Sequence, residues 1–106
     1  MVSFNEFKLV DLRIAKVLSV EPHPYADRLY VLKVDLGAEQ KQLVAGLKGH
    51  YQPEQLVGRS VVVVNNLQPA TLRGVESQGM LLAAQDGEKV VIVVPDGDVA
   101  PGSQVL

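Results

Sequence analysis

PEQLVGRSVVVV, residues 53–64, places one helical turn directly before a continuous apolar run. Pro53 has the fixed φ angle that suits the first position of a helix, and Gly58 stands where such a short helix would end. Ser60 to Val64 consists almost entirely of β-branched residues, which is typical of a buried central strand. The sequence therefore predicts a helical turn followed by a core strand in the middle of the chain.

Shorter strand patterns lie on both sides of this segment. Apolar runs between turn-forming residues predict strands over Asp11 to Val20, Leu29 to Asp35, Gln42 to Ala45, Leu72 to Val75, Met80 to Ala84 and Val90 to Val94. The first pattern is interrupted at Lys16, which predicts a bulge near Ala15. Asp86-Gly87 predicts a hairpin turn between the last two strands, and Ser3 and Glu6 have the spacing of a helix capping box.

Many short strands with one helical turn between the third and the fourth are typical of the OB fold, a five-stranded β-barrel. We predict an all-β chain of this architecture, with a short N-terminal helix and a C-terminal extension that turns at Pro101-Gly102. Periodicity alone leaves an antiparallel sandwich open as the alternative. A length of 106 residues suits one hydrophobic core, so residues 1–106 are predicted to form a single domain.

The composition excludes several classes of site. The chain has no cysteine, which excludes disulfides and thiolate chemistry, and its two histidines, His23 and His50, are far apart, so we predict no metal and no cofactor. No apolar run is long enough to cross a membrane, and the first residues lack the pattern of a secretory signal. These features favour a cytoplasmic protein that does not bind membranes.

The net charge of -2 is unusual for a protein that binds a polyanion, but the charge is unevenly distributed. Residues 1–74 carry nine basic and seven acidic side chains, whereas residues 75–106 carry one basic side chain, Lys89, and five acidic ones. Local potential guides a polyanion more than net charge does. A surface that binds anions is therefore expected within the first two-thirds of the chain.

Three segments carry a resemblance to a known family. They are Val10 to Ile14 (VDLRI), Glu21 to Leu32 (EPHPYADRLYVL) and Asn66 to Met80 (NLQPATLRGVESQGM), and the last is the most specific. They resemble the tRNA-binding domain found at the C-terminus of many bacterial methionyl-tRNA synthetases, in stand-alone structure-specific tRNA-binding proteins and in the endothelial monocyte-activating polypeptide family. The resemblance covers nearly the whole chain.

This resemblance implies an OB barrel that forms a homodimer and binds the outer corner of tRNA through its backbone and shape, without chemistry. It also implies action either as a free protein or in support of a methionyl-tRNA synthetase. A dimer has a physical rationale as well, because the N-terminal helix and the C-terminal strand are apolar segments that a small barrel need not cover itself.

The candidate tRNA-binding residues lie mainly in the polar loop between two apolar strands. Arg73 has a planar fork of donors that suits phosphate. The full set comprises Arg28, Lys33, Asn65, Asn66, Arg73, Ser77, Gln78 and Met80. Among the loop residues, each one other than Arg73 is better explained singly as a turn residue, a loop residue that satisfies the backbone or, for Met80, a core residue. The match of the whole loop to the family is what favours function.

Other positions modify this expectation. Tyr30 is a candidate ring for stacking on a base. Arg28 keeps the charge of the lysine that the family usually has in its ADKL segment. Gln68 and Thr71 stand where the family commonly has lysines, and each lost phosphate contact reduces the salt dependence of binding by ~0.7 to 0.9 units. We therefore expect weak to moderate affinity.

Two other functions compete with tRNA binding. A chaperone-like, peptide-binding dimer of the CsaA type has the same barrel and is favoured by the acidic balance. An enzyme is disfavoured, because Ser77 lacks a Gly-x-Ser-x-Gly elbow and no glycine-rich phosphate loop precedes a helix.

Overall fold

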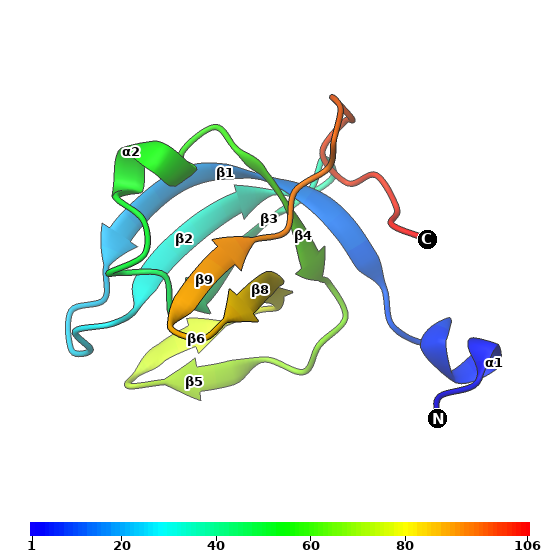
Figure 1. The fold of residues 1–106 in the computed structure, drawn as a ribbon, viewed down its shortest axis with the longest axis horizontal. Coiled ribbons are helices and arrows are strands. Elements are labelled where there is room, and N and C mark those ends of the chain that lie inside the picture. The colour runs from blue at the N-terminus through cyan, green and yellow to red at the C-terminus, as the bar shows by residue number, and fades with distance from the viewer.

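β-Strands make up most of the regular structure. The computed structural model describes residues 1–106. Two short helices accompany nine strands: α1 (Phe4–Phe7), β1 (Leu12–Pro22), β2 (Tyr30–Asp35), β3 (Gln40–Ala45), α2 (Pro53–Leu56), β4 (Ser60–Val64), β5 (Ala70–Leu72), β6 (Val75–Ser77), β7 (Met80–Leu81), β8 (Ala83–Asp86) and β9 (Lys89–Ile92) (Figure 1). The capped N-terminal helix, the helical turn at Pro53 and the strand over Ser60 to Val64 are confirmed.

Five strands form one antiparallel sheet in the order β3-β2-β1-β4-β7. The longest strand, β1, pairs with β2 and with β4 and curves around the core (Figure 1). The register between β1 and β2 shifts between Val17 and Ser19, so the bulge near Ala15 was predicted at the wrong place. Before the bulge, Ala15 and Val17 point into the core, and after it Val20 packs against the core. Side chains of a regular strand face the core at every second position, so one extra residue lies between Val17 and Val20.

The barrel closes where the segment between β6 and β7 meets the free edge of β3. The Gln78 amide donates to the Gln42 carbonyl at 2.8 Å, and the Gln42 amide donates to Gln78 Oε1 at 2.8 Å. One residue pair further along β3, the Val44 amide donates to Ser77 Oγ at 3.0 Å. The predicted all-β, five-stranded barrel of the OB type is confirmed, and the sandwich alternative is wrong.

Aliphatic side chains from four strands fill the barrel. Val17 of β1, Leu32 of β2, Leu43 of β3, and Val61 and Val63 of β4 are all at most 1% exposed. The helical turn α2 adds one fully buried side chain, that of Leu56. Burial of one leucine contributes about 1.5 to 3 kcal/mol, which stabilises a helix too short to form alone.

The second half of the chain differs in detail from the prediction. A strand was predicted over Leu72 to Val75, but Arg73 and Gly74 form the tip of the β5–β6 hairpin, because both have positive φ angles that no strand accommodates. The strand predicted over Met80 to Ala84 divides into β7 and β8. The hairpin turn predicted at Asp86-Gly87 lies at Gly87-Glu88, since Asp86 still pairs with Lys89.

The two ends of the chain lie outside the barrel. α1 projects away from it (Figure 1), and none of the four helix residues is buried. The C-terminal extension turns at Pro101-Gly102, as predicted, and joins β1 through a bridge between Arg13 and Gln104 rather than a full strand. No helix of the chain has both the length and the apolar character needed to span a membrane.

Candidate nucleic-acid interface

Arg73 stands at the tip of the β5–β6 hairpin in a left-handed backbone conformation. Leu72 pairs with Val75, so Arg73 and Gly74 form a two-residue loop, and their φ angles are 52° and 86°. Both central residues of a type I′ hairpin turn need positive φ, and Asn-Gly is the favoured pair there. Arg73 is the one residue other than glycine with positive φ in this chain. This conformation costs a residue with a Cβ roughly 1 to 2 kcal/mol.

The hairpin tip faces the loop between β1 and β2. Arg73 lines a surface hollow of about 410 Å³ together with Tyr25 and Arg28 of that loop. Two predicted tRNA-binding residues that are 45 positions apart in the sequence, Arg28 and Arg73, are therefore brought together. Tyr25 is 74% exposed, so its ring is free to meet a planar group.

Arg28 also borders a second hollow of about 590 Å³. Lys48, His50 and Gln52 line it from the loop after β3, and Asp27 lies beside Arg28 in both hollows. Arg28, Lys48 and Arg73 thus form a row of three cations with a single carboxylate among them, and we call these three residues the cationic rim. A hollow of this size is in the range of ligand sites, and this one is lined by polar groups.

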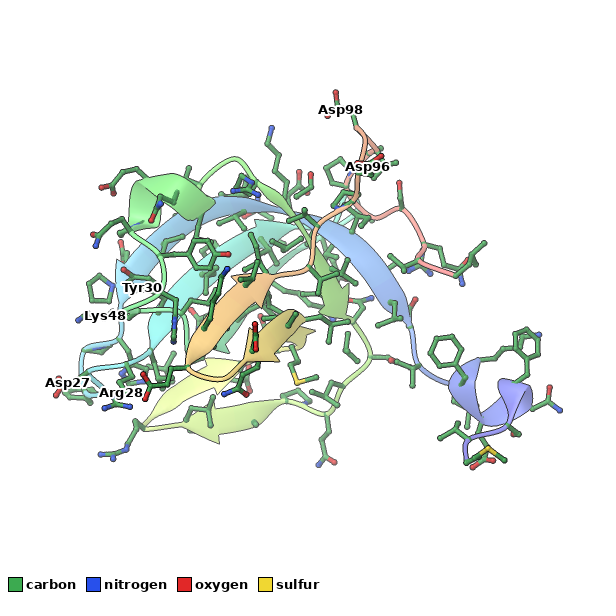
Figure 2. All side chains as sticks on the ribbon, viewed as in Figure 1. Asp27, Arg28, Tyr30, Lys48, Asp96 and Asp98 are labelled. Atoms are coloured by element: carbon green, nitrogen blue, oxygen red, sulfur yellow. The ribbon has the colours of Figure 1, made fainter.

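Two acidic side chains of the C-terminal segment lie apart from the cationic rim. Figure 2 shows Arg28, Lys48 and Asp27 at the left of the molecule and Asp96 and Asp98 at the top. The last two border a separate hollow with Arg59. Neither Asp96 nor Asp98 borders the hollows of the cationic rim, where Asp27 is the one carboxylate.

The exposed tyrosine of this region is Tyr25 and not Tyr30, the ring predicted to stack on a base. Tyr30 is only 3% exposed, and its hydroxyl donates to the Tyr51 carbonyl at 2.8 Å. The prediction of Tyr30 as a stacking ring is therefore wrong, because this side chain belongs to the core. Tyr25 was not among the predicted binding residues. Its position after Pro24 in a polar turn is the signal in the sequence for an exposed ring.

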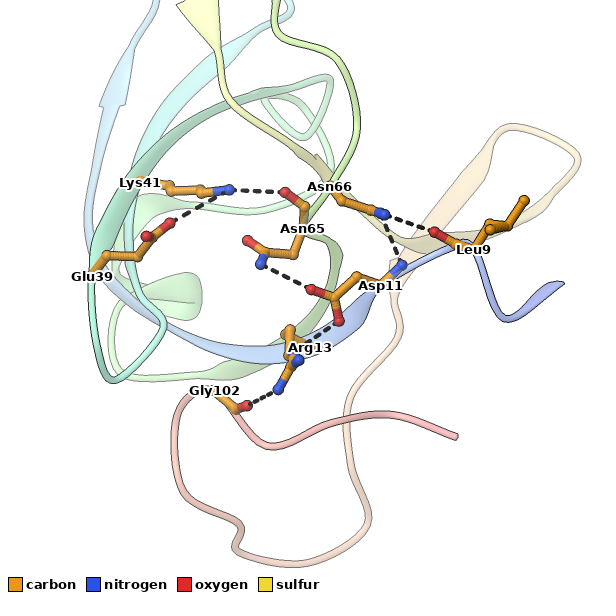
Figure 3. A network of polar contacts seen from close by, with 8 residues as sticks. All are labelled: Leu9, Asp11, Arg13, Glu39, Lys41, Asn65, Asn66 and Gly102. Atoms are coloured by element: carbon orange, nitrogen blue, oxygen red, sulfur yellow. Dashed lines mark hydrogen bonds and ion pairs between the residues drawn. The ribbon is translucent and has the colours of Figure 1, made fainter. Parts of the chain in front are cut away.

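Asn65 and Asn66 lie at the base of the β4–β5 connection, in a network of hydrogen bonds (Figure 3). Asn66 accepts from the Asp11 amide at 2.8 Å and donates to the Leu9 carbonyl at 2.7 Å. Asn65 Nδ2 donates to Asp11 Oδ2 at 3.2 Å, and Arg13 Nε donates to Asp11 Oδ1 at 2.7 Å. These amides hold the link between α1 and β1, and a tRNA contact by either stays a prediction.

Asp11 is the titratable group at the centre of this network. Its hydrogen bond from Asn65 is the main influence that holds the pKa of its carboxyl below the ordinary value, and Arg13 acts in the same direction. Arg13 also donates to the Gly102 carbonyl, at 3.2 Å, and so ties the C-terminal extension to β1. The charge of Arg13 is therefore engaged within the fold.

The remaining predicted residues lie elsewhere. The Ser77 hydroxyl is buried, accepts from the Val44 amide and donates to the Gly79 carbonyl at 2.9 Å, so neither of its partners is a histidine. Gln78 closes the barrel. Lys33 is exposed on β2 and Met80 is 45% exposed on β7, and neither lines the hollows of the cationic rim. Contacts of these four residues with tRNA stay predictions.

Comparison with known families gives the barrel its context. Residues 12–104 match the family model described as "Putative tRNA binding domain". The chain belongs to this family. The resemblance found in the sequence is confirmed, and it extends over all five strands of the barrel sheet.

Known relatives include synthetases and proteins whose crystallised chains match this one over almost their whole length. The methionine–tRNA ligase of Pyrococcus furiosus is 62% identical over 104 residues, which are 98% of this chain and 14% of the ligase. The crystal structure of a MetRS related protein from Pyrococcus horikoshii has a TM-score of 0.94 and 32% identity, and covers 100% of this chain and 98% of that one. The chaperone CsaA from Bacillus anthracis has a TM-score of 0.90 and 30% identity, with 100% and 99% covered.

Proposed function

We propose that the chain binds tRNA without catalysing a reaction on it, and that the cationic rim makes the principal contacts. Arg28, Lys48 and Arg73 would bind successive backbone phosphates, and Tyr25 would stack on an unpaired base or a terminal pair. The observation that carries this proposal is Arg73, a bulky cation kept at a left-handed position beside Arg28. Strain that a fold retains at an exposed tip is characteristic of functional sites.

The OB architecture supports the same surface. In OB folds the β1–β2 loop and the connection before the last barrel strand flank the nucleic-acid site. In this chain Tyr25 and Arg28 belong to the first loop and Arg73 to the second. Arginine and lysine side chains that suit phosphate line both hollows, so recognition of tRNA shape and backbone is the expected mode.

We further propose that the chain supports a methionyl-tRNA synthetase in the cytoplasm, as a domain or as a separate subunit. The chain spans about one seventh of the ligase that it resembles at 62% identity. A tRNA-binding module attached to a synthetase raises the effective tRNA concentration at its catalytic centre without any new catalytic group.

A homodimer is part of the proposal. Phe4 is 73% exposed and Leu9 75%, although apolar side chains gain by burial. Both belong to the N-terminal arm, which comprises α1 and the residues that link it to β1 and which projects from the barrel (Figure 1). In a homodimer, a second copy of the chain would cover this arm and bury its apolar side chains.

Sedimentation at micromolar concentration tests this proposal. The wild-type chain should give a dimer, and replacing Phe4 and Phe7 by aspartate should give a monomer.

A gel shift with mixed tRNA at two salt concentrations tests the main proposal. The wild-type chain should retard tRNA at low salt and release it as salt rises, and Arg73→Ala should bind more weakly with its fold unchanged. Equal binding by the two chains would remove Arg73 from the interface. Absence of any salt-sensitive complex would contradict tRNA binding as a whole.

Binding of unfolded peptides, as in a chaperone, is the second candidate function. The likeness to CsaA over the full chain favours it, and so do the exposed apolar residues of the N-terminal arm. Such binding would rest on apolar contacts and would be insensitive to salt. Competition between tRNA and an unfolded peptide on the wild-type chain separates the two functions.

A further inference from the structure

His23 joins the two loops that carry Arg28 and Arg73. Its side chain is 5% exposed, and both ring nitrogens have backbone partners. Nδ1 accepts from the Tyr25 amide at 2.9 Å, which leaves the ring proton on Nε2. Nε2 lies 2.8 Å from the Leu72 carbonyl and therefore donates to it. The imidazole thus bridges the β1–β2 loop to β5.

The position of this bridge matters for the cationic rim. Leu72 directly precedes Arg73, so the bridge holds the hairpin next to its tip. The His23 amide also donates to the Leu29 carbonyl at 3.0 Å, which closes the base of the loop that holds Arg28. One residue thus fixes both segments whose side chains line the shared hollow.

The hairpin has few other anchors on this side. Gln42 and Val44 of β3 bond to Glu76 and Ser77, which belong to β6. The bond from His23 is the one hydrogen bond that reaches β5 from outside the hairpin. A two-stranded hairpin is only marginally stable by itself, so its free strand depends on such an anchor.

We infer that His23 is a positioning residue that makes Arg28 and Arg73 act on tRNA as one unit. The inference rests on the proposed function, because the binding partner is the backbone of tRNA. His23 itself has almost no exposed surface and makes no contact with the ligand. It acts through the distance between two guanidinium groups, which must match the spacing of neighbouring phosphates if both are to bind at once.

Two substitutions separate the two bonds of the imidazole. In His23→Asn the side-chain oxygen lies as many bonds from Cα as Nδ1 does, so the bond from the Tyr25 amide is kept as an Asx turn, but the bridge to Leu72 is lost. In His23→Gln the side-chain nitrogen lies as many bonds from Cα as Nε2 does, so the bridge is kept. Thermal unfolding of each variant reports whether the barrel is intact.

The test measures the coupling between Arg28→Ala and Arg73→Ala for binding of tRNA to the full chain. Affinities of the two single variants and the double variant are measured in the wild-type, His23→Asn and His23→Gln backgrounds. In the wild-type background, the fold-loss of affinity in the double variant should be at least about threefold smaller than the product of the fold-losses in the two single variants. Such a difference is expected when two residues act together. This factor should fall to about one in His23→Asn and persist in His23→Gln.

Each outcome decides the inference. Unchanged coupling in a folded His23→Asn chain would overturn it, and so would loss of coupling in His23→Gln. If His23→Asn does not fold, the comparison of His23→Gln with the wild type decides in the same way. Additive losses in the wild-type background would also overturn it while leaving tRNA binding in place. Failure of tRNA binding as a whole differs from all of these, because then the wild-type chain itself forms no salt-sensitive complex with tRNA.

Discussion

Arg73 adopts a backbone conformation that asparagine and glycine adopt more readily. The side chain at this tip is exposed to solvent, and no hydrogen bond or ion pair within the fold offsets the strain. Stability and binding therefore make opposite demands on this position. Such a conflict is expected where a residue is kept for what it binds.

Replacing Arg73 by asparagine should stabilise the chain and weaken its binding of tRNA. Asparagine relieves the left-handed strain, so the free energy of unfolding should rise by up to about 1 kcal/mol. Loss of one phosphate contact should reduce the slope of log affinity against log salt by ~0.7 to 0.9. Urea unfolding and fluorescence anisotropy measure the two quantities. A destabilised variant, or one with wild-type affinity, would contradict this account of the tip.

Tyr25 should contribute to affinity through its ring and not through its hydroxyl. Tyr25→Phe should bind tRNA like the wild type, whereas Tyr25→Ser should lose about 1 to 3 kcal/mol of binding free energy, the usual contribution of base stacking. The phenylalanine variant is the matched control, because it keeps the ring that lines the hollow with Arg28 and Arg73. Equal affinities of the serine variant and the wild type would exclude stacking at this position.

Residue types in the sequence predicted the cations of the site better than its polar groups. Arg28 and Arg73 were expected from their charge and from the family motif, and they lie together. Asn65, Ser77 and Gln78 carry donors that suit a ligand equally well, but their hydrogen bonds go to Asp11, Val44 and Gln42. Which partner a polar side chain finds depends on segments far away in the chain, and no local pattern reports that.

At the scale of the elements, Ser77 at the end of β6 and Gln78 directly after it close the barrel along the free edge of β3. Their side chains accept hydrogen bonds from the backbone amides of Val44 and Gln42. The next residue is Gly79, and a larger residue would not fit there. A Cβ at this position would lie 2.9 Å from the Val64 carbonyl oxygen and 3.2 Å from Leu43 Cδ2. The Ser-Gln-Gly part of the family motif is therefore explained by closure of the barrel.

Ser77→Ala should destabilise the barrel by about 1 to 3 kcal/mol, because the buried Val44 amide loses its acceptor. Ser103→Ala is the control, since the Ser103 hydroxyl makes an exposed local bond to the Ala100 carbonyl and its loss should cost less than about 0.5 kcal/mol. Chemical denaturation of both variants gives the comparison. If Ser77→Ala were as stable as the control while tRNA binding fell, the hydroxyl would belong to the interface instead.

The pattern of elements was largely predictable, and the exceptions have local causes. α2 and β4 followed from Pro53, Gly58 and the run of valines. The bulge in β1 was misplaced because Leu18 is apolar yet 39% exposed, so the sequence concealed the change of face. The strand predicted through Arg73 failed because an arginine gives no sign of a left-handed turn in a sequence.

At the scale of the whole molecule, Asp11 connects the N-terminal arm, the β4–β5 connection and, through Arg13, the C-terminal extension (Figure 3). Its pKa is lowered in the folded chain, chiefly by the bond from Asn65 and also by Arg13. A lowered pKa means that the charged carboxylate stabilises the fold above the ordinary value of 3.8 and that this contribution is lost as the pH falls through the lower folded pKa.

Asp11→Asn should therefore differ from the wild type in a way that depends on pH. The melting temperature of the wild type should exceed that of the variant near neutral pH, and the difference should shrink as the pH is lowered below 3.8. Thermal unfolding of both chains over a series of acidic buffers measures this. A difference that stays constant through that range would show that the charge of Asp11 does not contribute to stability.

The assignment of the interface to the cationic rim can be tested by comparing two triple variants of the chain. One replaces the cationic rim, Arg28, Lys48 and Arg73, by alanine. The other replaces Lys16, Arg59 and Lys89, which are exposed and lie outside the two hollows of the rim. Both variants change the net charge equally, so any difference between them reflects where the charges lie.

The salt dependence of tRNA binding by these two chains and the wild type is the decisive measurement. Fluorescence anisotropy over a series of salt concentrations should show that the rim variant loses ~2 to 3 units of slope and most of its affinity. The control variant should lose less than about one unit. Equal losses in the two variants would mean that tRNA responds only to net charge, and the assignment of the interface to Arg28, Lys48 and Arg73 would be contradicted.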